Sequence, residues 1–391
     1  MRRSARARVA ALGLITLLVA AAVGCGTPPP PNFYAPPSSL QGRPGDVIAT
    51  VPTNFGLNGD VTSTAIKYRS TSATGARNYV TGTLLVPKAA WTGGGPRPVV
   101  SFAPGTQGVG DTCAASTTIP ASTFYQQSTL QSLLGRGWAV TVTDYEGIGT
   151  SGDHTYVIKD AEGHALLDIV RAAQRMPNSG VAANAPVAFW GYSQGGQAAA
   201  AAAELEASYA PELNVVGTAA GGVPSDLGPL AEHLDGPGNF WFSFLAFAAL
   251  GLNAAYPELN LESYLNDAGR QLLTQGRNAC LIDGLPLGAG RHISDITTRN
   301  PLTDPQWQAR IAEQRLGDEA PAAPVLLYHG TTDEIIPFAQ GTRLRDAWCA
   351  GGARVEWQEH ATDHIFGVLI DASGWLDARF KNQPFTPTCN R

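Results

Sequence analysis

The chain has 391 residues, of which 44% are hydrophobic, and it carries a formal net charge of -6 at pH 7. This hydrophobic content is enough for a sizeable core, which excludes a mostly disordered protein. The acidic balance excludes a nucleic-acid-binding surface, because such a surface needs clustered lysine and arginine. The length allows one large domain or two ordinary ones.

The N-terminus has the pattern of an export signal. Four arginines between positions 2 and 8 precede an apolar stretch, 9–23, that is too short to span a bilayer comfortably. Small residues then precede Cys25 in an order that resembles a bacterial lipobox, in which the cysteine is acylated and becomes the new N-terminus. We expect 1–25 to be a signal or lipoprotein peptide, with ordinary cleavage nearby as the alternative. The protein is then secreted, or held at the cell envelope through acylated Cys25.

The rest of the chain begins with a proline-rich segment, 26–45, which is expected to be a stiff, polyproline-like linker. Strands and helices then alternate through 46–391. The expected strands are 61–68, 79–86, 98–103, 138–143, 186–190, 215–221, 324–329 and 354–358. The expected helices are 123–134, 161–175, a segment ending near 207, 340–349 and 365–380. The first two strands form an antiparallel pair, and the alternation predicts an α/β fold with a mostly parallel sheet covered by helices on both faces.

From about 222 to about 320 the alternation is lost. The segment from Phe240 to Leu252 has helical length and is apolar around nearly its whole circumference, so it must be buried or face lipid. It is too short to cross a membrane. It is therefore either a core helix or part of a helical cap insertion that supplies an apolar wall for an acyl chain.

The pentad Gly191-Tyr192-Ser193-Gln194-Gly195 lies between an apolar strand and an alanine-rich helix. In a nucleophile elbow, a serine occupies a strained strand-to-helix turn with its hydroxyl exposed, and only glycine-sized residues fit beside it. The N-terminal amides of the following helix point to the place where an oxyanion would form. A glycine turn without chemistry is the alternative, and the choice depends on partners for the serine.

A nucleophilic serine needs a base that takes its proton and an acid that orients the base. In an α/β-hydrolase these residues follow in the order serine, acid, histidine. After Ser193, Asp333 follows the strand 324–329 and His364 follows the strand 354–358. The sequence therefore predicts a catalytic triad of Ser193, Asp333 and His364.

Each partner has a rival nearby. His360 is the rival base, but it lies closer to the preceding strand, whereas His364 begins the last helix after a loop. Glu334 and Asp363 are rival acids, and Asp363 cannot easily reach back to the neighbouring imidazole. His360 and His364 also have the spacing of a metal pair, but no HExxH glutamate accompanies them, so we expect no metal.

The oxyanion hole needs two backbone donors. Gln194, directly after the nucleophile, is expected to supply one, and the loop 104–108 is expected to supply the other through Thr106 or Gln107.

A formal GxGxxG also occurs at 147–152, but the next helix begins too late for a dinucleotide site, so a glycine turn is the better interpretation. No cofactor is expected.

Without Cys25, four cysteines remain: Cys113, Cys280, Cys349 and Cys389. An even number in an oxidising compartment predicts two disulfides, and their three connectivities stay open. None of the spacings is that of a zinc site.

Five sequence runs, in this order along the chain, resemble the secretory lipase family, the lipase A type of α/β-hydrolase: GTQGVGDTC, DYEGIGTSGDHTY, EGHALLDIVRA, GYSQGG and HGTTDEIIP. The resemblance covers roughly residue 45 to the C-terminus. It implies the α/β-hydrolase fold with a mostly helical cap, and hydrolysis of acylglycerols or simpler carboxylic esters through an acyl-enzyme. It also implies the triad Ser193, Asp333 and His364, and the disulfides Cys113–Cys280 and Cys349–Cys389. An acyltransferase with the same triad, and a cell-envelope lipid-binding protein without turnover, are the alternatives.

Overall fold

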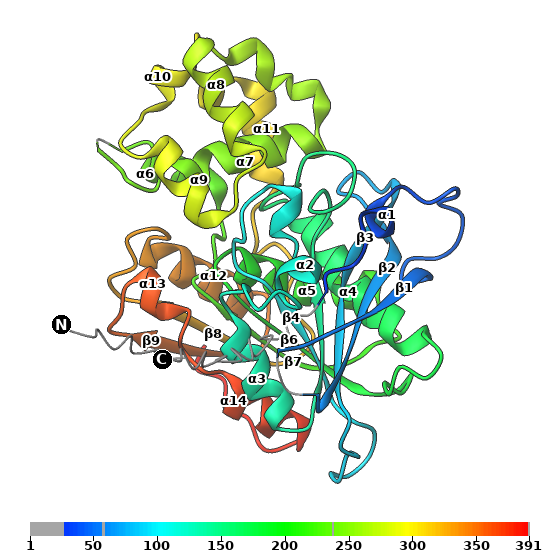
Figure 1. Cartoon of the computed structure of the whole chain (residues 1–391). Coiled ribbons are helices and arrows are strands. Elements are labelled where there is room, and N and C mark those ends of the chain that lie inside the picture. Colours follow the sequence, from blue (N-terminus) through cyan, green and yellow to red (C-terminus); the bar gives the residue numbers. More distant parts are fainter. Residues whose placement is uncertain (1–26, 57–58, 237, 390–391) are drawn as a thin grey trace, which may run out of the picture.

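The computed structural model describes residues 27–56, 59–236 and 238–389, and the expected signal peptide with Cys25 lies outside them (Figure 1). Nine strands form one sheet in the order β1-β2-β3-β5-β4-β6-β7-β8-β9. Strands β1, β2, β3 and β5 pair antiparallel, and the pairs from β5 through β4 to β9 are parallel. The strands are β1 (Val47–Thr53), β2 (Val61–Thr71), β3 (Arg77–Pro87), β4 (Val99–Ala103), β5 (Ala139–Thr143), β6 (Pro186–Tyr192), β7 (Asn214–Gly221), β8 (Val325–Gly330) and β9 (Val355–His360).

Helices cover both faces of this sheet, as predicted. The alternation of side chains along a strand sends Val99 of β4 to one face and Val100 to the other, and both are fully buried. The first face carries α4 (Lys159–Arg175), α5 (Gln194–Tyr209) and α12 (Phe338–Ala350). The second carries α2 (Ala115–Thr118), α3 (Gln127–Gly135) and α14 (Ser373–Phe380).

Between β7 and β8 the chain forms a separate group of helices, which we call the insertion (222–324). It lies at the top of Figure 1, beyond the ends of the central strands. Its helices are α6 (Leu227–Leu234), α7 (Phe242–Ala255), α8 (Asp267–Gly276), α9 (Leu281–Gly288), α10 (Ile293–Ile296) and α11 (Pro305–Glu313). They share an apolar core of their own, in which Phe242 and Phe247 of α7 are almost completely buried. Among the described residues, no helix is long and apolar enough to cross a membrane.

Two disulfides, Cys113–Cys280 and Cys349–Cys389, are present in the structure. The first joins the loop after β4 to the insertion, and a β-bridge between Gly108 and Cys280 lies beside it. Next to this bridge the amide of Leu281 donates to the carbonyl of Gln107 at 2.8 Å. The insertion is therefore fixed to the loop that was predicted to supply an oxyanion donor.

The structure differs from the sequence prediction at the N-terminal end of the described chain. The segment before residue 46, expected to be an extended spacer, instead packs against the rest of the protein. It contains a helical turn, α1 (Pro31–Tyr34), in which Phe33 is buried. The Tyr34 hydroxyl lies 2.9 Å from the hydroxyls of both Ser116 and Thr117. The strand β1 was missed, since Pro52 weakens its pattern, and proline is tolerated there because β1 is an edge strand.

Two expected helices also have different bounds. The helix expected at 123–134 starts only at Gln127, since Gln126 has the non-helical backbone angles φ -92° and ψ 19°. The expected last helix is wrong: it is divided into α13 (His364–Gly367) and α14. Asp371 lies between the two, and its carboxylate accepts hydrogen bonds from the amide and hydroxyl of Ser373, both at 2.9 Å, which sets a new helix start.

Candidate active site

Ser193 occupies the turn between β6 and α5. Its φ of 60° and ψ of -122° are unusual for a residue with a side chain, so the backbone is strained there. A Cβ atom on Gly191 would overlap with the carbonyl of Gly195, and one on Gly195 would overlap with the carbonyl oxygen of Ala103. Both flanking glycines are therefore required by close backbone contacts, which is the geometry of a nucleophile elbow.

Three of the predicted residues form one chain of hydrogen bonds. His364 Nε2 lies 2.9 Å from Ser193 Oγ, and His364 Nδ1 lies 2.7 Å from Asp333 Oδ2. Since a carboxylate only accepts, Nδ1 carries the proton of a neutral imidazole, and Nε2 is free to accept from the serine hydroxyl. The three side chains follow β6, β8 and β9, so the sheet brings their strand ends together at one edge.

The Asp333 carboxylate has further hydrogen-bond donors besides His364. Its Oδ1 accepts the amides of Ile335 at 3.1 Å and Ile336 at 2.7 Å, and Nε2 of His329 lies 3.3 Å from Oδ2. Burial by itself raises the pKa of this carboxyl, but the hydrogen bonds from His329 and His364 outweigh it and hold the pKa well below its usual value. Asp333 is therefore ionised at neutral pH.

His329 was not recognised from the sequence as part of this arrangement. Its Nε2 also lies 2.8 Å from the carbonyl of Ile336, so it faces two acceptors and must carry a proton. The ring thus ties the acid to the turn that follows it. A histidine at a strand end, four residues before the acid, was the available signal.

The rival residues are not members of the hydrogen-bonded chain of Ser193, His364 and Asp333. His360 ends β9, and its Nε2 is buried without a hydrogen bond in the described part of the chain. Glu334 accepts the backbone amide of His364 at 3.1 Å, and Asp363 caps α13. No group of three or more histidine, cysteine, aspartate or glutamate side chains in the described ranges could hold a metal ion.

The loop after β4 lies against the elbow. Its Gly105 amide donates to Gln126 Oε1 at 2.9 Å, so this amide is already used. The Thr106 hydroxyl bonds to the Tyr156 hydroxyl at 2.8 Å. Within the residues that the structure describes, the backbone amides of Thr106 and Gln107 donate no hydrogen bond. Both amides are therefore free to donate to an acceptor beside Ser193.

The GxGxxG run at 147–152 is a turn, as predicted. Gly147 and Gly149 have φ values of 80° and 72°, and α4 begins only at Lys159. No helix therefore begins at these glycines, as a dinucleotide site would require.

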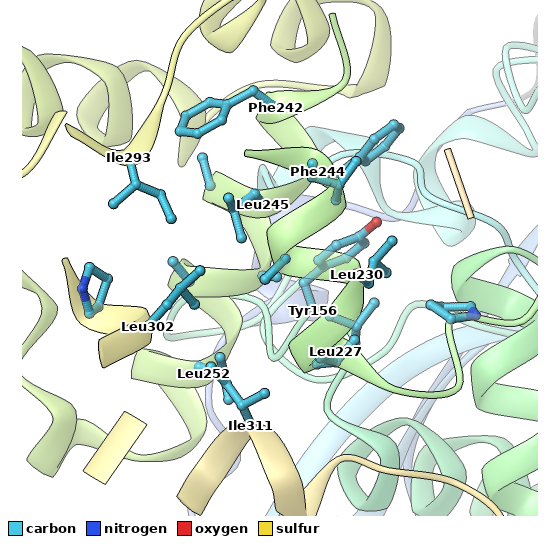
Figure 2. A pocket seen from close by; sticks show the side chains of 18 of the residues that line it. Tyr156, Leu227, Leu230, Phe242, Phe244, Leu245, Leu252, Ile293, Leu302 and Ile311 are labelled. Carbon is cyan, nitrogen blue, oxygen red and sulfur yellow. The ribbon is translucent and has the colours of Figure 1, made fainter. Parts of the chain in front are cut away.

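A pocket of about 1000 Å³, its open mouth included, extends from Ser193 and Gln194 into the insertion. Figure 2 shows its wall, to which α6, α7 and α11 contribute apolar side chains. The labelled members include Leu230, Phe242, Leu245, Leu252, Ile293 and Ile311. No lining residue is charged, so the pocket favours an uncharged apolar group. The helix α7 thus contributes both to the core of the insertion and to the wall of this pocket.

Comparisons with known proteins indicate one family. The model of the secretory lipase family matches residues 114–388. A Mycobacterium tuberculosis protein named probable inactive lipase MT1628 is 30% identical over 377 residues, which cover 90% of this chain and 82% of that protein. Secreted triacylglycerol lipase LIP7 of Malassezia globosa is 29% identical over 386 residues, covering 92% of this chain and 80% of that lipase. Candida antarctica lipase A in its closed state superposes with a TM-score of 0.83 at 24% identity, covering 93% of this chain and 89% of that one, which shows the α/β-hydrolase fold.

We expect Gly195→Ala to destabilise the protein by about 2–4 kcal/mol, because the added methyl group overlaps with backbone that cannot move freely. Gly135→Ala is the matched control, since a Cβ at that position meets no atom within 4 Å and should change stability by less than about 0.5 kcal/mol. Urea denaturation measures both. Equal stability of the two variants would contradict the close contact at the elbow.

Proposed function

The chain belongs to the secretory lipase family, and we propose that it is an exported serine hydrolase that cleaves triacylglycerols or simpler carboxylic esters. The observation that carries this proposal is the hydrogen-bonded chain from Ser193 through His364 to Asp333. These are the groups that ester hydrolysis through an acyl-enzyme needs, in hydrogen-bonding reach and in a family of lipases.

In the proposed reaction, Ser193 Oγ attacks the ester carbonyl while Nε2 of His364 takes the hydroxyl proton. Ionised Asp333 stabilises the imidazolium that forms. His364 then returns the proton to the departing alcohol, which leaves the acyl group on the serine. Water then attacks the acyl carbonyl while His364 takes one of its protons. His364 returns this proton to Ser193 Oγ as the bond to the acyl group breaks and the carboxylic acid leaves.

The negative charge of the tetrahedral intermediate falls on the former carbonyl oxygen. We propose that the amide of Gln194 and one amide of Thr106 or Gln107 stabilise it. Removal of one such donor in other hydrolases raises the barrier by about 2.7–4 kcal/mol, so this interaction is a large part of catalysis.

The insertion is proposed to act as a cap that binds the acyl chain. Its pocket is lined almost entirely by apolar side chains and reaches Ser193, as a binding site for an acyl chain requires. In this assignment 46–391 is one hydrolase domain that contains the cap at about 222–320.

Two alternatives keep the same fold. An acyltransferase would use an alcohol other than water, and product analysis with both acceptors present separates it from a hydrolase. A lipid-binding protein without turnover is suggested by the relative named probable inactive lipase. The serine–histidine distance of 2.9 Å favours turnover in this chain.

We expect Ser193→Ala to lower kcat for p-nitrophenyl ester hydrolysis by at least about 10⁴-fold, because no other group replaces the nucleophile. A fluorophosphonate probe should label the unaltered protein and not this variant. Ser208→Ala, an exposed serine on the same helix, is the matched control and should retain full activity and labelling. An unlabelled wild-type protein would favour lipid binding without turnover.

Ala249→Phe should shorten the acyl chain that the enzyme accepts, because Ala249 lines the pocket and the larger ring occupies its space. The ratio of kcat/KM for a p-nitrophenyl ester of a long acid to that for the butyrate should fall about tenfold or more, given that each methylene in a pocket is worth about 1–3 kcal/mol. Ala254→Phe, on the same helix but outside the pocket lining, should leave the ratio unchanged. An unchanged ratio in both variants would assign the acyl chain to another surface.

Export and anchoring are proposed from the N-terminal pattern, the two disulfides and relatives named secreted lipases. If Cys25 is acylated, Cys25→Ala should move the protein from the membrane fraction to the medium, and Thr27→Ala should not. Mass spectrometry of the N-terminal peptide identifies the lipid. A variant that stays cell-bound, or a mature N-terminus elsewhere, would refute anchoring through this cysteine.

A further inference from the structure

We propose that Glu162 is a positioning residue that, as a neutral carboxylic acid, fixes both sides of the oxyanion hole. The inference rests on the proposed function, since it concerns how the oxyanion donors of that reaction are held. Glu162 lies inside α4, on the helix that packs beside α5, and its side chain is completely buried.

The Glu162 carboxyl connects two backbone segments at the site. Its Oε1 accepts the side-chain amide of Gln194 at 2.7 Å and the backbone amide of Val157 at 2.9 Å. Its Oε2 is buried and has no hydrogen-bond partner among the described residues. A buried unpaired oxygen is far less costly on a neutral acid than on a carboxylate, so this arrangement favours the protonated form.

The contact to Gln194 reaches the first oxyanion donor. The second proton of the Gln194 amide group points to Nε2 of His154, 2.9 Å away. This Nε2 must therefore accept, and Nδ1 of His154 donates to the carbonyl of Glu146 at 2.9 Å. Both protons of the amide are used, so the side chain is locked, and the backbone N–H of the same residue is held at the start of α5.

The contact to Val157 reaches the other side of the hole. Val157 has a φ of 54°, which is strained for a β-branched residue, and the Glu162 hydrogen bond stabilises this conformation. The preceding residue, Tyr156, bonds through its hydroxyl to Thr106 on the candidate donor loop at 2.8 Å. One buried carboxyl thus links the elbow helix to the loop after β4.

The charge of this network is set by burial. Burial raises the pKa of Glu162 to about 8, although the hydrogen bonds from Gln194 and Val157 oppose the rise. Burial lowers the pKa of His154 to about 4. The other titratable groups that face Glu162 are Tyr145 after β5 and Tyr156, whose pKa values burial raises, so they are neutral as well. Between about pH 4 and pH 8, Glu162, His154 and these two tyrosines are therefore all in their neutral forms.

Loss of the Glu162 proton places a negative charge behind the Gln194 amide, where it repels the developing oxyanion. The reaction should therefore slow as the pH rises through about 8. A group with a pKa of about 8 is about nine-tenths protonated at pH 7 and about one-tenth at pH 9, so kcat should fall about tenfold over this range.

The test is the pH profile of kcat for a short-chain ester, followed in a pH-stat, in wild type and Glu162→Gln. Glutamine keeps the accepting oxygen but has no proton to lose near pH 8. We expect this variant to lower kcat at pH 7 with little change in KM, and to abolish the tenfold fall between pH 7 and pH 9.

Glu204→Gln is the matched control. Glu204 is a half-buried acid in the C-terminal half of α5 whose pKa burial raises to about 7, and it accepts hydrogen bonds from Trp348 and Gly317. This variant should retain the fall. If Glu162→Gln retains it too, or if wild type shows no fall, the proposal is wrong.

Should Glu162→Gln not fold, Gln194→Leu carries the test in its place. The hydrogen bond from the Gln194 side chain lowers the pKa of Glu162. Loss of this bond in the variant should therefore raise that pKa and move the fall in kcat to higher pH. An unmoved profile refutes the proposal. Fluorophosphonate labelling of Ser193 in the same wild-type sample separates the two levels: absent labelling refutes the proposed function, whereas labelling with an unresponsive profile refutes only the role of Glu162.

Discussion

The site depends on how closely helix α5 approaches the backbone after β4. Gly195 leaves no room for a Cβ atom beside the carbonyl of Ala103, and the turn before it holds Ser193 in a strained conformation. The alanines at 198–203 are all buried, and their small side chains let α5 lie close to the sheet and to α4. This packing places the serine, the first amide of the helix and the loop after β4 at one point, and every other part of the proposed chemistry is arranged around it.

Much of this frame could be predicted from local patterns. The central strands and helices have clear periodicity, and the strand–turn–helix context of Ser193 is explicit in the sequence. Asp333 and His364 were predicted from the order of residues in an α/β-hydrolase and from their positions directly after two late strands. The choice of His364 over His360 agrees with the hydrogen bonds of the structure.

The rest depends on contacts that no local pattern contains. The last helix is interrupted by side-chain hydrogen bonds of Asp371, and the proline-rich segment packs through Phe33 instead of extending. Glu162 occupies an ordinary helical position in the sequence, and its role follows only from Gln194 and Val157 meeting it in space. The same is true of His329, which becomes a partner of Asp333 through the turn after β8.

Two buried carboxyls, one bonded to the side chain of Gln194 and the other to His364, have opposite protonation. Asp333 gains hydrogen bonds from two histidines and two amides, which keep it ionised where the proposed mechanism forms an imidazolium. Glu162 accepts from only two donors, so burial keeps it neutral where the mechanism forms an oxyanion. A negative charge on both sides would stabilise the first species and destabilise the second. The environments thus separate two chemically similar groups into two electrostatic roles, which is how a single fold supplies both a charged and a neutral acid at one pH.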